Sequence, residues 1–329
     1  MSRIVRFHEY GDASVLQLET LEVPAPAADE VQIAVKAIGL NRAEVMFRSN
    51  HYLQQAEFPS RLGYEAAGDV LAVGSAVNGF AVGDAVSLIP PLDIARWGTY
   101  GEVINVPAYL TVKHPTNLSY EQAAASWMQY VTAWGALIDQ ARLSQGDVVL
   151  VTAASSSVGL AAFQIARKVG ATAIAITRSR AKAQALLEAG AAHVIVSDEE
   201  DIVTRVMALT DGQGARVVFD PVGGPAFEAL TASMARGGIL LEYGALSSEP
   251  TPFPLFTVLG KSLTLKGYLY AEIVSDPAAL ARAKAFIVDG LASGELQPII
   301  ARTFPLDEIQ AAHRYLEANQ QVGKVVVTV

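Results

Sequence analysis

The chain contains no cysteine among its 329 residues. Disulfide bonds, a thiol nucleophile and a thiolate metal site are therefore excluded. Charge is also scarce, since 17% of the residues are Asp, Glu, Lys or Arg, against about a quarter in a typical soluble chain. Acidic residues prevail, and a net charge of −9 argues against nucleic acid or an anionic membrane as the main partner.

Length and hydropathy set the scale of the molecule. A chain of 329 residues is expected to form about two domains. Apolar residues make up 51% of it, which is enough to build large buried cores. The first residues, MSRIVRFHEYG, lack the apolar core of a secretory signal, so we expect a cytoplasmic location.

The most informative segment is the uncharged run from Val148 to Ala166, VVLVTAASSSVGLAAFQIA. An apolar strand, a turn of small residues and an apolar helix follow one another, which is typical of a dinucleotide phosphate site. Of the usual G-x-G-x-x-G pattern only the last glycine, Gly159, is present, and small residues of a serine-rich turn take the other places. The run is near the length of a membrane span. However, polar residues interrupt it, which favours a buried strand, turn and helix.

Two patterns divide the chain. Its first third has short alternating runs such as Val31–Val35 and five glycines between residues 63 and 83, which predicts a β-rich domain with tight turns. From Asp147 onward, strands alternate with helices, which predicts a doubly wound parallel sheet of six strands. The expected strands are Val148–Thr152, Ala173–Thr177, His193–Val196, Arg216–Phe219, Gly238–Glu242 and Leu263–Gly267. Two further helices, Pro277–Ser293 and Leu306–Ala318, and a last strand, Lys324–Val329, are expected to return to the first domain.

The end of the second expected strand indicates which dinucleotide binds. An NAD site usually has an acidic residue there for the ribose hydroxyls, but no acid occurs between Gly159 and Glu188. The segment reads TRSRAK instead, with three cations and a serine. Arg178, Ser179 and Lys182 suit the additional 2′-phosphate of NADPH, through charge-assisted hydrogen bonds. We therefore predict NADPH rather than NADH as the cofactor.

Motifs spread over the whole chain indicate a family when they are taken in order. They are HEYGDASVLQL near the start, KAIGLNRAEVMFRSNHY, GYEAAGDVLAVGSAV followed by VGDAV, EQAAASWMQYVTAWGAL, FDPVGG and the closing GKVVV. In this order and spacing they resemble the medium-chain dehydrogenase/reductase superfamily, in its zinc-free quinone oxidoreductase-like branch. The resemblance implies an α/β chain with a GroES-like β-rich catalytic domain, residues 1–124 and 271–329. A Rossmann NADP-binding domain with the six-stranded sheet would comprise residues 125–270.

The resemblance also implies which residues bind the cofactor. The family's phosphate turn A-x-x-G-x-V-G matches residues 153–159, where serines replace the middle residues and are small enough to fit. The implied cofactor residues of the turn are Ser155, Ser156, Ser157, Val158 and Gly159, with Lys182 on the 2′-phosphate. At the nicotinamide end they are Thr132, Tyr243, Gly244 and Ala245, while Asn41 would contact the nicotinamide ribose or the substrate.

Zinc-dependent relatives use a Cys in the loop near Asn41, a Gly-His-Glu motif and a later Cys or acid. Here the Cys is absent and the motif reads Gly63-Tyr64-Glu65, while the five histidines are scattered without ligand spacing. Tyrosine is a poor zinc ligand, so we expect no catalytic zinc. We expect Glu65 to pair with a cation such as Arg48 instead.

Hydride transfer without a metal suits electron-poor acceptors, because the anion formed from an enone or a quinone is stabilised by conjugation. One proton donor then completes the reduction. By resemblance to enoyl reductases of the superfamily, Tyr52 is the expected donor, and His51 is a second candidate. Asn50 stands where the family usually has glycine. Asn41 is expected to hydrogen-bond the acceptor carbonyl, in the manner of an oxyanion site.

These observations predict an NADPH-dependent reductase of quinones or α,β-unsaturated carbonyls, which acts on a small molecule. Two alternatives stay open: an alcohol dehydrogenase of the same superfamily, and a non-catalytic, crystallin-like NADPH-binding protein. Family members commonly dimerise through the last strand of the nucleotide domain. Residues 262–268 are therefore expected to pair with a second copy in a homodimer.

Overall fold

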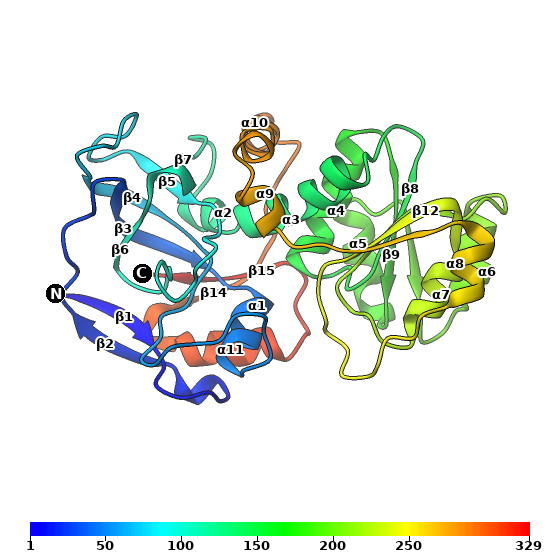
Figure 1. The fold of residues 1–329 in the computed structure, drawn as a ribbon, viewed down its shortest axis with the longest axis horizontal. Helices are drawn as coiled ribbons and strands as arrows, with labels where there is room; N and C mark the ends of the chain where they lie inside the picture. The colour runs from blue at the N-terminus through cyan, green and yellow to red at the C-terminus, as the bar shows by residue number, and fades with distance from the viewer. The chain divides into compact units, whose positions relative to one another are not determined.

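The computed structural model describes every residue from Met1 to Val329. The chain forms two compact units: unit 1 comprises Met1–Met128 and Val288–Val329, and unit 2 comprises Gln129–Ile287. The blue and red ends of the chain in Figure 1 both belong to unit 1, so the C-terminal tail shares a unit with the N-terminal third. The exact domain boundaries inferred from the sequence, after residues 124 and 270, remain a prediction.

Unit 2 is built on a six-stranded parallel sheet with the order β10-β9-β8-β11-β12-β13. The order reverses between β8 and β11, and ligands of such sheets bind at the carboxyl ends of the strands near that point. The strands are β8 (Val148–Val151), β9 (Thr172–Thr177), β10 (His193–Val196), β11 (Ala215–Asp220), β12 (Met234–Glu242) and β13 (Thr264–Gly267). The helices are α4 (Ser157–Lys168), α5 (Ala183–Glu188), α6 (Ile202–Leu209), α7 (Ala226–Ala232), α8 (Leu255–Lys261) and α9 (Ala271–Val274).

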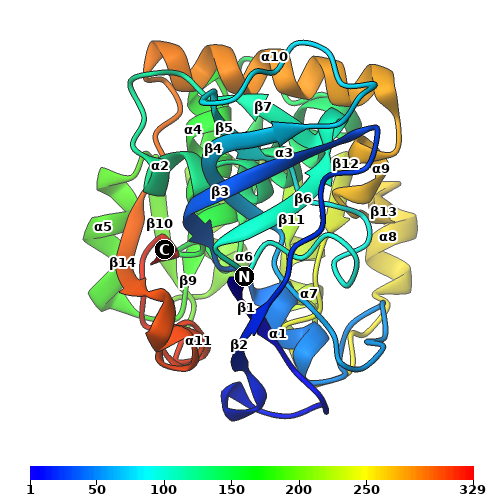
Figure 2. The same cartoon turned by 90° about the vertical axis from the view of Figure 1, so that its left-hand side faces the viewer.

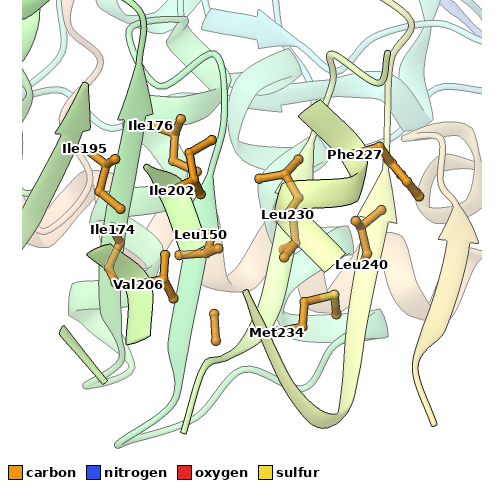
Figure 3. Packing of buried hydrophobic residues seen from close by; sticks show 12 residues of the cluster. Leu150, Ile174, Ile176, Ile195, Ile202, Val206, Phe227, Leu230, Met234 and Leu240 are labelled. Atoms are coloured by element: carbon orange, nitrogen blue, oxygen red, sulfur yellow. The ribbon is translucent and has the colours of Figure 1, made fainter. Parts of the chain in front are cut away.

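One face of this sheet carries a continuous apolar cluster. Leu150 of β8, Ile176 of β9 and Leu240 of β12 pack there with Val206 of α6 and Phe227 of α7 (Figure 3). Alternate residues of a strand point to the same face, so each strand adds every second side chain to the cluster. Each large side chain buried in this way stabilises the fold by about 1.5–3 kcal/mol. The doubly wound parallel sheet predicted from the alternation of strands and helices is confirmed.

Unit 1 is organised around β3 (Glu30–Gly39), which pairs antiparallel with β4 (Glu65–Val73), β6 (Val103–Pro107) and β15 (Lys324–Thr328). Figure 2 shows β3 crossing this β-rich part of the chain. In the register, Gly39 lies opposite both Glu65 and Val326. This pairing brings the start of the last strand close to residues 41 and 65, far from it in sequence.

The remaining elements of unit 1 are three further strands of this sheet, a separate two-stranded sheet and three helices. They are β1 (Ser2–Arg6), β2 (Gln17–Leu21), α1 (Arg42–Arg48), β5 (Ala85–Leu88), β7 (Thr111–Lys113), α2 (Tyr120–Ala124), β14 (Ile300–Pro305) and α11 (Ile309–Glu317). Two helices, α3 (Trp127–Trp134) and α10 (Pro277–Ser293), cross the division between the units. None of the helices combines the length and the apolar character that a membrane span needs.

Candidate active site

The turn between β8 and α4 in unit 2 presents free backbone donors. Ser156 caps α4, and its Oγ accepts a hydrogen bond from Gly159 N at 3.1 Å. The amides of Ser157 and Val158 make no hydrogen bond within the protein, so the positive end of this helix has two donors for an anion. A Cβ on Gly159 would lie 2.6 Å from a carbonyl oxygen of the turn, which requires glycine there. Ala153, with φ +43°, adopts a left-handed conformation, which is uncommon for a residue other than glycine.

Two cations stand at the end of β9, beside this turn. Lys182 Nζ donates to Ser155 Oγ at 3.0 Å. Burial and the nearby charge of Arg178 lower the pKa of Lys182, as expected for two like charges held together without an anion. The third cation of the segment, Arg180, pairs with Glu199 on the surface. Lys182 therefore links the segment after β9, which also carries Arg178, to the turn after β8.

The residues predicted for the nicotinamide end lie on α3 and after β12. Tyr243 stacks on Phe219 of β11, with ring centroids 4.0 Å apart and planes at 20°. Gly244 follows, and a Cβ there would lie 2.8 Å from the carbonyl oxygen of Pro221. Thr132 is buried on α3. At Gly244 the backbone after β12 thus passes so close to Pro221 that no residue larger than glycine fits there.

A cavity of about 430 Å³ adjoins this segment, lined by Gly244, Ala245 and the Glu242 side chain among others. Glu242 lies opposite Asp220 in the pairing of β12 with β11. Asp220 accepts hydrogen bonds from Thr152 Oγ1 and from the amides of the following loop. The Glu242 carboxyl group interacts with Asp220 and with the amide of Gly244. Burial and the charge of Asp220 raise the pKa of Glu242 to about 9, so it is neutral at pH 7.

In unit 1, Asn41 belongs to a buried polar cluster with Glu65 and Lys324. Lys324 Nζ donates to Asn41 Oδ1 at 2.7 Å and forms an ion pair with Glu65 Oε1. Asn41 Nδ2 donates to Glu65 Oε1 at 3.2 Å and to Gly39 O at 3.3 Å. Both amide hydrogens are therefore engaged within the protein, and only Oδ1 has a lone pair left for a ligand. Asn41 can accept from a ribose hydroxyl, but in this arrangement it has no hydrogen to donate to a carbonyl.

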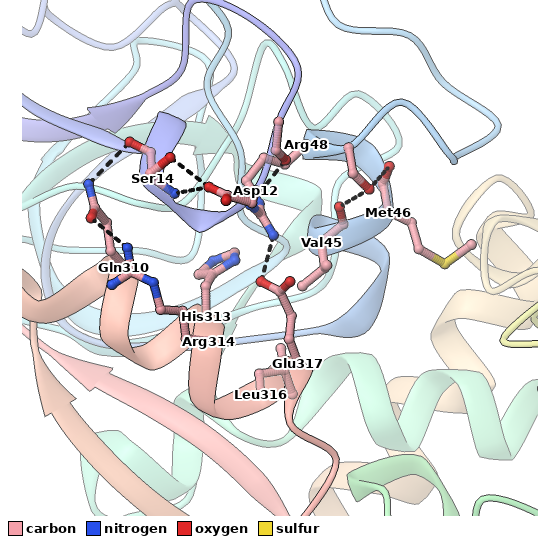
Figure 4. Close-up of polar contacts among 12 residues, drawn as sticks. Asp12, Ser14, Val45, Met46, Arg48, Gln310, His313, Arg314, Leu316 and Glu317 are labelled. Carbon is pink, nitrogen blue, oxygen red and sulfur yellow. Dashed lines mark hydrogen bonds and ion pairs between the residues drawn. The ribbon is translucent and has the colours of Figure 1, made fainter.

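The pairing of Glu65 with Arg48 expected from the sequence is wrong. Arg48 at the end of α1 forms an ion pair with Glu317 of α11 at 2.6 Å and donates to Gly11 O at 3.1 Å (Figure 4). The cation beside Glu65 is Lys324, because β15 returns to pair with β3. A pairing between residues so far apart in sequence leaves no trace in local periodicity.

The segment after α1 holds the expected proton donor. Asn50 has φ +58°, a left-handed conformation that asparagine tolerates, so it substitutes for the family's glycine without a change of turn. Burial raises the pKa of the Tyr52 hydroxyl, which a hydrogen bond with Tyr64 partly offsets. The second candidate, His51, is exposed, and its Nδ1 lies 3.3 Å from Ser49 Oγ.

Behind these residues lies a buried carboxyl group that the sequence analysis did not single out. Glu44 accepts hydrogen bonds from Asn41 N at 2.7 Å, Tyr64 N at 2.9 Å and the Tyr100 hydroxyl at 2.5 Å. The Tyr100 hydroxyl also lies 3.1 Å from His313 Nε2. Burial raises the pKa of Glu44 to about 7, against the effect of these hydrogen bonds. The Asn-x-x-Glu spacing at a helix start was the one signal that could have indicated this residue.

The residues at the position of the zinc site in metal-dependent relatives do not fit zinc. Both oxygens of Glu65 are engaged, Oε1 by Lys324 and Asn41 and Oε2 by Met128 N at 2.9 Å. The buried ammonium group of Lys324 therefore lies against Glu65, the acidic side chain at this position. No cysteine is present to act as a zinc ligand in place of Glu65. No group of three acidic, histidine or cysteine side chains is arranged to hold a metal ion.

The predicted site residues fall into two groups, one in each unit. Unit 1 holds Asn41 and Tyr52 on either side of α1. Unit 2 holds those at the carboxyl ends of β8, β9 and β12 and on α3, namely Ser155, Ser156, Ser157, Val158, Gly159, Arg178, Ser179, Lys182, Tyr243, Gly244, Ala245 and Thr132. The residues that sequence reasoning missed are the buried carboxyls Glu44, Asp220 and Glu242, and the cation Lys324.

Comparisons with known proteins agree with this architecture. The alcohol dehydrogenase GroES-like domain matches residues 27–116, and the zinc-binding dehydrogenase family matches residues 157–285. Quinone oxidoreductase 1 of Escherichia coli (strain K12) is 33% identical over 331 residues, which cover 98% of each chain. The 2-haloacrylate reductase of a Burkholderia species is 29% identical, covering 97% of each chain.

Solved structures give the same result. The crystal structure of Escherichia coli quinone oxidoreductase complexed with NADPH superposes with a TM-score of 0.90 at 32% identity, over 99% of this chain and all of that one. Both the GroES-like domain and the parallel sheet are thus present, as predicted. The chain belongs to the medium-chain dehydrogenase/reductase superfamily, in its quinone oxidoreductase-like branch.

Proposed function

We propose that this protein is an NADPH-dependent reductase that transfers hydride to quinones or α,β-unsaturated carbonyls without a metal ion, and that it acts in the cytoplasm. The observation that carries the proposal is the anion site of unit 2. Two unpaired amides at the start of α4 stand near Ser155, whose hydroxyl contacts Lys182, and no acid ends β9. The relatives named as quinone oxidoreductases, one of them complexed with NADPH, support the same cofactor and reaction.

Each group of residues in unit 2 has a role in holding the cofactor. The amides of Ser157 and Val158 would bind the pyrophosphate, because the helix dipole adds to their hydrogen bonds. Arg178 and Lys182 would bind the 2′-phosphate, assisted by the hydroxyls of Ser155 and Ser179. Ser156 contributes by capping α4, and Gly159 by allowing the helix to pack closely on the turn. Tyr243, Gly244, Ala245 and Thr132 would line the nicotinamide end.

When bound, NADPH supplies the hydride. Residues of unit 1 would then donate a proton to the reduced acceptor and orient the nicotinamide ribose. Tyr52 would donate its proton to the enolate formed from an unsaturated carbonyl. Asn41 would accept a hydrogen bond from the nicotinamide ribose through Oδ1, which Lys324 holds in place. A reduced quinone can take its protons from water, so one pocket can serve both kinds of acceptor.

The decisive experiment follows NADPH oxidation by the purified protein with 1,4-benzoquinone, a 2-alkenal and an aliphatic ketone in parallel. We expect oxidation with the first two only, because their reduced anions are conjugated. Turnover of the ketone would support the alcohol dehydrogenase alternative. Tight NADPH binding without turnover of any acceptor would support the non-catalytic alternative.

Cofactor choice is tested by Arg178→Asp, which removes a cation from the phosphate site and adds an acceptor suited to a ribose hydroxyl. We expect NADPH to bind about 10- to 100-fold more weakly, while NADH binding is retained or improved. Arg180→Asp is the matched control, since that guanidinium already pairs with Glu199. Equal losses in the two variants, measured by calorimetry, would exclude Arg178 from the site.

We further propose a homodimer built on the outer strand of unit 2. β13 pairs only with β12, so its other edge is open. The neighbouring helix α8 exposes three apolar side chains, Leu255 at 51%, Phe256 at 86% and Leu259 at 64%. Charge is scarce in this chain, and an apolar surface beside an open strand suits a second copy of itself.

Light scattering at micromolar concentration checks the assembly. We expect twice the chain mass of 34.8 kDa for the natural protein and the chain mass for the double variant Phe256→Glu, Leu259→Glu. Val82→Glu, which places a charge on an exposed apolar residue of unit 1, is expected to remain dimeric. A natural protein that is monomeric under these conditions contradicts the proposal.

A further inference from the structure

The buried carboxyl group of Glu44 has an unusual set of neighbours. It bridges three segments of unit 1 by accepting hydrogen bonds from Asn41 N, Tyr64 N and the Tyr100 hydroxyl. Its side chain is fully buried. Two of these contacts are backbone amides, which fix the start of α1 relative to the segment that carries Tyr64. Tyr64 in turn shares a hydrogen bond with Tyr52, the expected proton donor.

The Tyr100 hydroxyl gives this carboxyl group two ways to satisfy its hydrogen bonds. When Glu44 is ionised, Tyr100 donates to Glu44 Oε2 and accepts from His313 Nε2, if that nitrogen carries the imidazole proton. When Glu44 is protonated, it donates to Tyr100, and Tyr100 donates to His313 Nε2. Both backbone contacts persist in either state, since each carboxyl oxygen keeps a lone pair for its amide. The side chain can thus change charge without a change of geometry.

His313 is suited to this role because it stays neutral. Burial and the charges of Arg48 and Arg42 lower its pKa to about 3. Figure 4 shows His313 on α11 near the ion pair of Arg48 and Glu317. An imidazole that remains neutral can reverse the direction of its hydrogen bond by changing tautomer, and its other nitrogen, Nδ1, has no partner that would oppose this.

We propose that Glu44 is a positioning residue of the reduction: it holds Tyr64 behind Tyr52 with a carboxyl group whose charge controls how readily Tyr52 donates its proton. This inference rests on the proposed function. A negative charge on Glu44 raises the pKa of the Tyr52 hydroxyl and so makes it a weaker acid. Neutral Glu44 removes that charge and leaves the contacts in place.

The other groups that act on this site are few and fixed. The positive charge of Lys324 on β15 favours the carboxylate form of Glu44. Arg48 on α1 and Glu65 on β4 act on Tyr100 with opposite sign. Lys324 and Glu65 are held in a buried ion pair, and Arg48 is paired with Glu317. Glu44 is therefore the member of the cluster that changes charge near neutral pH, where its pKa lies.

The turnover test compares two acceptors over a range of pH. We expect turnover of a 2-alkenal to fall as the pH rises through about 7, since ionised Glu44 weakens the donor. Turnover of 1,4-benzoquinone, which takes protons from water, should lack this inflection. Glu44→Gln removes the inflection for the alkenal, and Tyr52→Phe lowers alkenal turnover at least about tenfold at every pH. An inflection that survives in Glu44→Gln overturns the inference.

Two further variants separate Glu44 from its neighbours. Tyr100→Phe removes a hydrogen bond that favours the carboxylate, so the inflection should move to higher pH. His51→Gln is the control, since that exposed imidazole directly precedes Tyr52 in the chain. An inflection that disappears in His51→Gln but not in Glu44→Gln would assign it to His51 and contradict the role of Glu44.

A readout without substrate tests the titration itself. The folded state raises the pKa of Glu44 from 4.5 to about 7, so it binds more protons than the unfolded chain between these values. Stability should fall with rising pH across this window, and Glu44→Gln should lack that part of the slope. If the protein reduces no acceptor, both the proposed function and this role of Glu44 are wrong. If the enzyme is active but its alkenal turnover is independent of pH, only the role of Glu44 is wrong.

Discussion

The two units bury a glutamate at their sites in opposite ways. Glu65 of unit 1 is paired with a cation, Lys324, and both of its oxygens accept hydrogen bonds. Glu242 of unit 2 lies beside a second acid, Asp220, on the neighbouring strand. The first carboxyl group forms an ion pair inside the protein, whereas the second is neutral at pH 7.

The difference shows what decides the state of a buried acid. Burial alone disfavours the charged form of both side chains. A cation at contact distance offsets that effect for Glu65, and a like charge on the neighbouring strand adds to it for Glu242. Unit 1 therefore carries a fixed charge pair near Asn41. Unit 2 places a protonated acid beside the backbone predicted to line the nicotinamide pocket.

The largest effect on stability is expected from breaking the ion pair of Lys324 and Glu65 in unit 1. Lys324→Met keeps an unbranched side chain of similar length but leaves Glu65 buried without its cation. An unpaired buried charge destabilises a protein by about 3–5 kcal/mol. We expect a loss of this size in urea denaturation followed by circular dichroism.

The double variant Lys324→Met, Glu65→Gln sharpens that result. The Gln side chain keeps one oxygen, which can accept from Met128 N as Glu65 does. Replacing both charges should recover at least about half of the loss, because the desolvation of an unpaired charge disappears with it. If the two substitutions were simply additive, the ion pair would have no special role in stability.

Local sequence patterns predicted most of the fold. The apolar run at Val148–Val151 and the small residues after it gave the first strand and turn of the parallel sheet, because strands buried on both faces have a distinctive composition. Between Tyr120 and Arg142 the chain forms α2, α3 and a turn of π-helix at Gly135–Gln140. A Cβ on Gly135 would lie 2.0 Å from the Tyr268 hydroxyl, a tertiary contact that periodicity does not contain.

Site residues that lie in local motifs were predictable from the sequence. Site residues that meet only through the pairing of strands were not. The cations after β9 and the serines after β8 were evident as local motifs. Lys324 and Glu65 meet only because β15 returns to β3, and Glu242 meets Asp220 only through the register of β12 with β11. The sequence analysis missed Glu44: only the Asn-x-x-Glu spacing could have indicated it, and its contact with Tyr100 required the folded structure.

The smaller expected effect comes from Glu242 of unit 2, tested by Glu242→Gln. The folded state raises the pKa of Glu242 from 4.5 to about 9, so it binds more protons than the unfolded chain across that range. Stability should therefore decline as the pH rises toward 9, and the variant should lack this decline. Below pH 4.5 the two proteins should melt together, since Glu242 is then protonated in the folded and in the unfolded chain. At pH 9 we expect the variant to melt about 2–4 °C higher, which corresponds to about 1 kcal/mol. Identical pH profiles would mean that Glu242 is ionised in the folded protein, and that a cation or water offsets the charge of Asp220.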